Sequence, residues 1–192
     1  VPKRVRPKEP PHRAARRLVL RNQRVKLPSW SRFYLAPSYS AGEKQYAYPL
    51  DILAQVLGGG STSRLYRRLV VELGIASSAG AWYSGSGLDY GEFGLYASPK
   101  VGGDIEAVEK ALLSEVRAAL KAGFKAEDIE RAKKLISAQA IYARDGIRAG
   151  PNAFGSAFTQ GRTIDEVENW PERITAVTPE QVMAAAKAVL KV

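Results

Sequence analysis

Residues 57–83 read LGGGSTSRLYRRLVVELGIASSAGAWY, and this stretch decides the fold. Residues 46–57 place apolar side chains at helical spacing, and the three glycines at 58–60 end that helix. Residues 61–73 predict a second helix, because leucines fall on one face and arginines on another. A strand is predicted after Gly74, so two helices joined by glycines lead directly into a sheet.

The sequence on both sides of this stretch adds strands. Residues 75–99 are rich in Tyr and Gly and alternate in polarity, which predicts a hairpin with its turn near Gly85–Asp89. Upstream, Leu18 and Leu20 predict one short strand. Trp30 and residues 33–35 predict another, with Pro28 as the break between them.

The second half of the chain is predicted to be helical. Apolar residues recur every three or four positions over 104–123 and again over 126–144, before Gly146, Gly150 and Pro151 interrupt the pattern. Thr-x-x-Glu/Gln boxes then mark two more helix starts, at Thr163 with Glu166 and at Thr178 with Gln181. Strands followed by helices indicate an α+β fold, in which helices cover one face of a small, mostly antiparallel sheet.

Charge separates an N-terminal arm from the rest. The 192 residues are 45% hydrophobic, and residues 17–192 are enough for one α+β domain with a sizeable core. Residues 1–16 contain four prolines and predict a basic linker. The net charge of +10 resides within residues 1–32, which hold eleven Lys or Arg and one acid, whereas the other 160 residues carry 18 charges of each sign.

The composition excludes several chemistries. The chain has no Cys, which excludes a disulfide scaffold and a thiol nucleophile. Its one His is His12, in the arm, so neither a multi-histidine zinc site nor a Ser-His-Asp triad is expected. No segment is apolar for long enough to span a membrane, and we expect no membrane insertion.

Several local patterns have both a chemical and a structural interpretation. The glycine cluster lacks the Gly-Lys pair of a P-loop and follows a helix, so a helix–loop–helix joint is preferred to a phosphate loop. Glu127, Asp128 and Glu130 fit the start of a helix better than an acid–base pair. The arginine group of the second helix could bind a carboxylate or peptide carbonyl, or form a solvated face; its members are Arg64, Arg67 and Arg68.

Aromatic residues and the basic arm raise the question of nucleic acid. The aromatic residues could stack bases or bind a peptide, although cross-strand packing is the commoner role in strands; they are Trp82, Tyr83, Tyr90 and Tyr96. The arm lacks interleaved aromatic residues, so no nucleic-acid partner is expected, and an arm-dependent nucleic-acid binder is kept as a third hypothesis.

Residues 57–83 resemble the glycine-rich turn, helix and strand in the second half of pitrilysin/insulinase-type zinc metallopeptidases, the HxxEH inverzincins. The resemblance extends through LDYGEFGLYASP at 88–99 and GFKAEDIERAKKLI at 123–136, and it covers nearly all of the chain after about residue 16.

The resemblance implies a clam-shell enzyme of two homologous α+β halves, in which the first half binds zinc through HxxEH. This chain has no HxxEH and looks like the second half of a bacterial enzyme, with residues 1–16 as the linker. The implied partners are the N-terminal HxxEH domain, in the same chain or in a partner subunit, and a peptide substrate. A second copy of the chain, in a homodimer, is a further candidate partner. No metal ligand is expected in this chain, and a Cys-free domain of this kind favours the periplasm over the cytoplasm.

The family's second half usually contributes an Arg and a Tyr seven residues apart, which help hold the peptide over the zinc. In this chain those positions fall on Val70 and Ser77, so the usual clamp is missing. Arg68 and Tyr83 are predicted as substitutes because they lie nearby, and no residue is predicted to be catalytic. The leading hypothesis is a substrate-side domain of a zinc endopeptidase, and the alternative is a catalytically dead assembly or binding subunit of the same fold.

Overall fold

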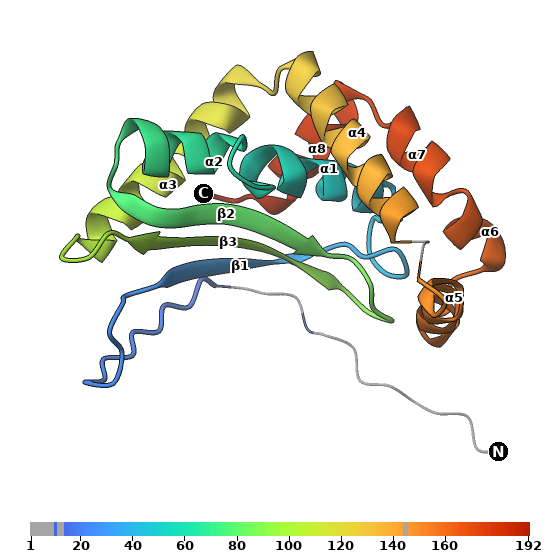
Figure 1. The fold of residues 1–192 in the computed structure, drawn as a ribbon, viewed down its shortest axis with the longest axis horizontal. Coiled ribbons are helices and arrows are strands. Elements are labelled where there is room, and N and C mark those ends of the chain that lie inside the picture. Colours follow the sequence, from blue (N-terminus) through green and yellow to red (C-terminus); the bar gives the residue numbers. More distant parts are fainter. Residues whose placement is uncertain (1–9, 11–13, 144–145) are drawn as a thin grey trace.

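A three-stranded antiparallel sheet with helices over one face forms the body of the molecule (Figure 1). The computed structural model describes Pro10 and residues 14–143 and 146–192. The strands are β1 (Trp30–Ala36), β2 (Ala76–Ser84) and β3 (Gly91–Pro99), in the order β1-β3-β2. The predicted hairpin and the predicted α+β class are therefore confirmed.

The helical layer is larger than the sheet. Its elements are η1 (Lys44–Tyr46), α1 (Ala47–Gly58), α2 (Arg64–Tyr66), η2 (Arg67–Glu72), α3 (Ile105–Ala122), α4 (Ala126–Tyr142), α5 (Ala149–Thr159), α6 (Ile164–Glu168), α7 (Trp170–Ala176) and α8 (Pro179–Val189). Contacts with the sheet come from α1, α2, η2, α3 and α8. The two helices predicted around the glycines are confirmed, although the second starts at Arg64, after Ser63, and continues as a π-helical turn in η2.

The core lies between this layer and the inward face of the sheet. Phe93 and Leu95 of β3 are fully buried there, as are Leu53 of α1 and Leu112 of α3. Ile129 of α4 and Val182 of α8 are buried members of the same cluster. These side chains form one continuous apolar cluster, and its burial holds the helical layer against the sheet.

The predicted start and end signals of the helices are present. The side chain of Asp104 accepts hydrogen bonds from the backbone N–H groups of the first turn of α3, and Gly123 ends that helix at a φ of 87°. Both predicted capping boxes form, one at Thr163 and one at Thr178. Each satisfies two backbone groups that the helix itself leaves without a partner.

Three expectations about elements differ from the structure. The strand predicted at Leu18 and Leu20 is wrong: these leucines are 96% and 85% exposed, and no strand in the described part of the chain pairs with them. A helix, α5, forms where Gly150 and Pro151 were expected to interrupt, because proline is tolerated in a first turn whose N–H groups lack helical partners. The short α7, which contains Pro171 near its start, was also not predicted.

Two expectations fall partly on residues that are not described. The predicted linker at 1–16 lies outside the described residues except for Pro10 and 14–16, and so does the end of the second long helix at Arg144. Within the described part, residues 14–29 have no regular helix or strand and are exposed. Arg17 makes two hydrogen bonds of 2.7 Å to Glu109 of α3, which ties the start of this segment to the helical layer.

Candidate functional site

The arginine group of α2 and η2 packs toward α3. Arg64 Nε lies 2.5 Å from Glu115 Oε1, and Arg68 Nε lies 3.8 Å from the other oxygen of the same carboxylate. Arg68 also bonds to Glu72 one turn along its own helix, at 2.9 Å. Two of the three arginines therefore share an acidic partner, and Arg67 is exposed. The side chain of Arg68 keeps 45% of its surface open to solvent, so part of its guanidinium remains accessible.

Tyr83, the other predicted substrate-binding residue, faces the helical layer from β2. Its hydroxyl donates a 2.5 Å hydrogen bond to the carbonyl of Pro37, and its ring packs against Phe93 with centroids 6.4 Å apart. Burial raises the pKa of this hydroxyl above its ordinary value. Arg68 and Tyr83 thus have partners on different elements, and the structure does not bring them together as a pair.

The positions of the family's usual Arg and Tyr have local structural roles here. Val70 packs partly buried against the core from η2. Ser77 lies at a β-bulge in β2, and its hydroxyl donates to the carbonyl of Pro99 at 3.0 Å. Neither side chain supplies the cation or the phenol that the clamp would require.

The glycine-rich joint lets α1 approach the sheet closely. A Cβ built on Gly58 would lie 1.7 Å from the backbone nitrogen of Ala81, so no other residue fits there without moving α1 away from β2. Gly60 adopts a φ of 100°, which favours glycine, and Ser63 starts the next helix. The structure supports the interpretation of this motif as a helix–loop–helix joint.

Among the described residues, no helix or further strand covers the face of the sheet opposite the helical layer (Figure 1). Phe33 is 57% exposed and Tyr96 39% exposed on this face, and Trp82 lies in the same row across the strands as Phe33. The Phe33 and Trp82 rings pack across the sheet with centroids 6.1 Å apart. An exposed aromatic group on an otherwise well-packed fold marks a surface suited to a partner or ligand.

A buried polar cluster joins α1 to the C-terminal helices. The Tyr39 hydroxyl donates to Asp51 Oδ2, and Trp170 Nε1 donates to the Tyr39 oxygen at 2.8 Å. The guanidinium of Arg162 lies 4.3 Å from the centroid of the Tyr39 ring. Desolvation raises the pKa of Asp51 to about 7, although the Tyr39 hydrogen bond and Arg162 act in the opposite direction.

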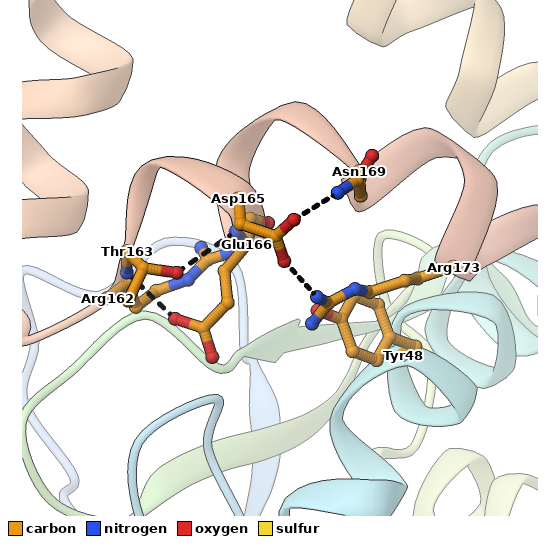
Figure 2. Close-up of polar contacts among 7 residues, drawn as sticks. All are labelled: Tyr48, Arg162, Thr163, Asp165, Glu166, Asn169 and Arg173. Atoms are coloured by element: carbon orange, nitrogen blue, oxygen red, sulfur yellow. Dashed lines mark hydrogen bonds and ion pairs between the residues drawn. The ribbon is translucent and has the colours of Figure 1, made fainter.

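The same cluster continues along α6 and α7 (Figure 2). Figure 2 shows Arg173 between Tyr48 and Asp165, with hydrogen bonds of 3.1 Å to the tyrosine hydroxyl and 2.8 Å to the carboxylate. Asn169 donates to the other oxygen of Asp165. The network attaches α6 and α7 to the start of α1.

Sequence reasoning missed this cluster because its members lie far apart in the chain. Tyr39 and Trp170 are 131 positions apart, and no spacing rule connects them. One signal was present: Asp51 is the single charged residue in the mainly apolar YAYPLDILAQVL of residues 46–57. An acid on an apolar helix face requires a hydrogen-bond partner, and that requirement would have singled it out.

The acidic group at the start of α4 behaves as predicted for a helix N-terminus. Glu127 and Asp128 lie in its first turn, Asp128 pairs with Arg131, and Glu130 pairs with Lys133 at 2.7 Å. Among residues 14–143 and 146–192, no three His, Cys, Asp or Glu side chains are grouped to hold a metal ion. Over the same described ranges, no helix combines the length and apolar character needed to cross a membrane.

Comparison with known proteins gives matches in sequence and in fold. Residues 1–136 match the sequence model of a family described as the peptidase M16 inactive domain. The chain is 28% identical over 148 residues to an uncharacterized zinc protease of Streptomyces coelicolor, a match that covers 77% of this chain and 31% of that protein. The chain therefore spans about a third of the length of that relative.

Solved structures share the fold at low sequence identity. A protease from Helicobacter pylori superposes with a TM-score of 0.79 and 18% identity, over 88% of this chain and 40% of that one. The inactive peptidase domain of a candidate zinc protease from Bordetella parapertussis gives 0.76 and 20%, over 90% of both chains. A chain of complex III from Candida albicans gives 0.71 and 15%, over 88% of this chain and 41% of that one.

Proposed function

Because the chain belongs to the family of peptidase M16 inactive domains, we propose that it is the substrate-side, non-catalytic half of a zinc-dependent endopeptidase. The observation that carries the proposal is the sheet, which is covered by helices on one face and presents an open aromatic surface on the other. In this proposal the open face forms one wall of a peptide chamber, and the catalytic half forms the opposite wall.

The residues of this chain do not fit a zinc site. Its donor set holds no Cys and a single His, and the described residues contain no cluster of potential ligands. Zinc in this proposal belongs to an N-terminal HxxEH domain, in the same chain or in a partner subunit. This half then contributes by excluding water when the two halves close and by holding an extended peptide.

Arg68 and Tyr83 remain the residues that we propose for substrate binding. Arg68 lies on η2 in the helical layer, so it would bind a part of the peptide that extends beyond the open face, and the exposed part of its guanidinium leaves N–H groups free to donate to a peptide carbonyl. Tyr83 would act less directly, since its hydroxyl already bonds to Pro37 and its ring lies on the helical side of the sheet. It would position Trp82, its neighbour in β2, on the open face.

The alternative is a catalytically inactive assembly or binding subunit of the same fold. It is favoured by the replacement of the family's Arg and Tyr by Val70 and Ser77. The similarity to a chain of complex III shows that the fold also occurs in a large assembly.

Zinc content and peptide hydrolysis, measured on this chain alone and on the chain joined to its HxxEH half, test the proposal. We expect hydrolysis and about one zinc per molecule only in the joined protein. A matched control replaces the HxxEH glutamate by Gln, which should abolish hydrolysis without releasing this domain. Normal turnover by the chain alone would contradict the proposal, and no zinc or hydrolysis in either form would favour the assembly subunit.

A further inference from the structure

The open face of the sheet is built in rows across the three strands. Phe33, Gly94 and Trp82 form one row, and Ser31, Tyr96 and Gly80 form the next. On the other side of the first row lie Leu35, Glu92 and Ser84. Side chains in successive rows are roughly 7 Å apart, which is the spacing of alternate residues in an extended peptide.

The two glycines in these rows determine how the aromatic rings lie. A Cβ on Gly94 would lie 2.4 Å from the Trp82 indole, and a Cβ on Gly80 would lie 2.6 Å from the Tyr96 hydroxyl and 2.7 Å from its ring. Each ring therefore lies across the glycine of the neighbouring strand, with its other side toward solvent. Trp82, Tyr96 and Phe33 together form a surface that we call the aromatic platform.

Glu92 is the charged residue of these three rows. It extends from β3 on the same face, one row from Trp82, and no ion pair joins it to another side chain of the described part of the chain. Glu92 is half-buried, and residues 14–29, just upstream of β1, are exposed. A free carboxylate beside aromatic rings attracts cations and repels phosphate or carboxylate groups.

We infer that the aromatic platform and Glu92 bind a lysine or arginine side chain of an extended peptide. This inference rests on the proposed function, because it assumes that the open face meets the substrate. A cation over Trp82 gains from the π-electrons of the indole, and Glu92 is placed to pair with the same cation or with one two residues along the peptide. Basic, extended peptides are thus the preferred substrate class.

The test uses three blocked hexapeptides that differ only at two alternate positions, which hold lysine, norleucine or glutamate. Each is titrated into the ¹⁵N-labelled chain, and the indole N–H signal of Trp82 is followed beside those of Trp30 and Trp170. We expect the lysine peptide to shift the Trp82 signal and to bind about 3- to 30-fold more tightly than the norleucine peptide. The glutamate peptide should bind most weakly.

Variants distinguish binding at the aromatic platform from non-specific binding of the peptide. Trp82→Leu should weaken the lysine peptide by about 3- to 30-fold, and Glu92→Gln, a surface change that leaves the packing intact, should weaken it several-fold and reduce its salt dependence. Tyr142→Leu is the matched control, because Tyr142 is 74% exposed at the end of α4, and it should have no effect.

Equal affinity for the three peptides, no shift with any of them, or unchanged lysine binding in Glu92→Gln would overturn the inference. These outcomes are separable from a failure of the proposed function. If the peptide-binding test fails but the joined two-domain protein cleaves peptides and the chain alone does not, the preference for basic peptides is wrong and the proposed function stands.

Discussion

Gly58→Ala should lower the free energy of unfolding by on the order of 3–5 kcal/mol, or prevent folding. The new methyl group would lie 1.7 Å from the backbone nitrogen of Ala81 and 2.5 Å from the carbonyl carbon of Gly80. Both are atoms of β2 and cannot turn aside as a side chain could, so α1 must shift away from the sheet. Urea denaturation followed by circular dichroism measures the loss.

Gly155→Ala is the matched control for this prediction. Gly155 lies within α5, and a Cβ there would meet nothing within 4 Å. Alanine should stabilise the helix slightly, by about 0.5–1 kcal/mol. If the two alanine variants were equally stable, the close approach of α1 to β2 would not be the reason for the glycine at position 58.

The second large effect concerns pH. The pKa of Asp51 is raised to about 7 in the folded protein, from its ordinary value of 3.8, because desolvation disfavours its charged form. Between these values the folded chain holds a proton that the unfolded chain has released, so stability falls as pH rises from about 4 to 7. The fall should reach about 2–4 kcal/mol and then level off above pH 7.

Asp51→Asn removes this titration while keeping an oxygen that can accept the Tyr39 hydrogen bond. The variant should therefore lack that part of the fall and be more stable than the wild type at pH 8, as measured by urea denaturation from pH 4 to pH 9. Tyr39→Phe removes a group that lowers the pKa of Asp51 in the folded protein, so the fall in stability should still begin near pH 4 but extend to a higher pH. Parallel curves for the wild type and Asp51→Asn would contradict this account.

The sequence predicted the elements that are specified by residues close together in the chain. The capping boxes at Thr163 and Thr178, the glycine joint and the hairpin each depend on residues close in the chain, and all are present. The strand expected at Leu18 and Leu20 failed because a strand requires a neighbour, which no local pattern reveals. The helix α5 was missed for a different reason: a proline is tolerated in the first turn of a helix, and the local pattern did not show that Pro151 lies in a first turn.

The functional surface was predictable only in part. Alternation along 75–99 placed Trp82 and Tyr96 in strands, but alternation does not say which face of a sheet is left uncovered. The folded register shows that both rings lie on the open face and that Tyr83 lies on the other. The resemblance to inverzincins identified the family, whereas no local pattern showed that Arg64 and Arg68 share Glu115 of α3 as a partner.

The most direct test of the account introduces one cysteine into the joined two-domain protein, since this domain has none of its own. Phe33→Cys places the thiol on the open face, and Tyr142→Cys places it on the helical layer. After reaction with a bulky maleimide, we expect the first variant to lose most of its peptide hydrolysis and the second to retain it. Full activity of the labelled Phe33→Cys protein would contradict the claim that the open sheet face forms the wall of the peptide chamber.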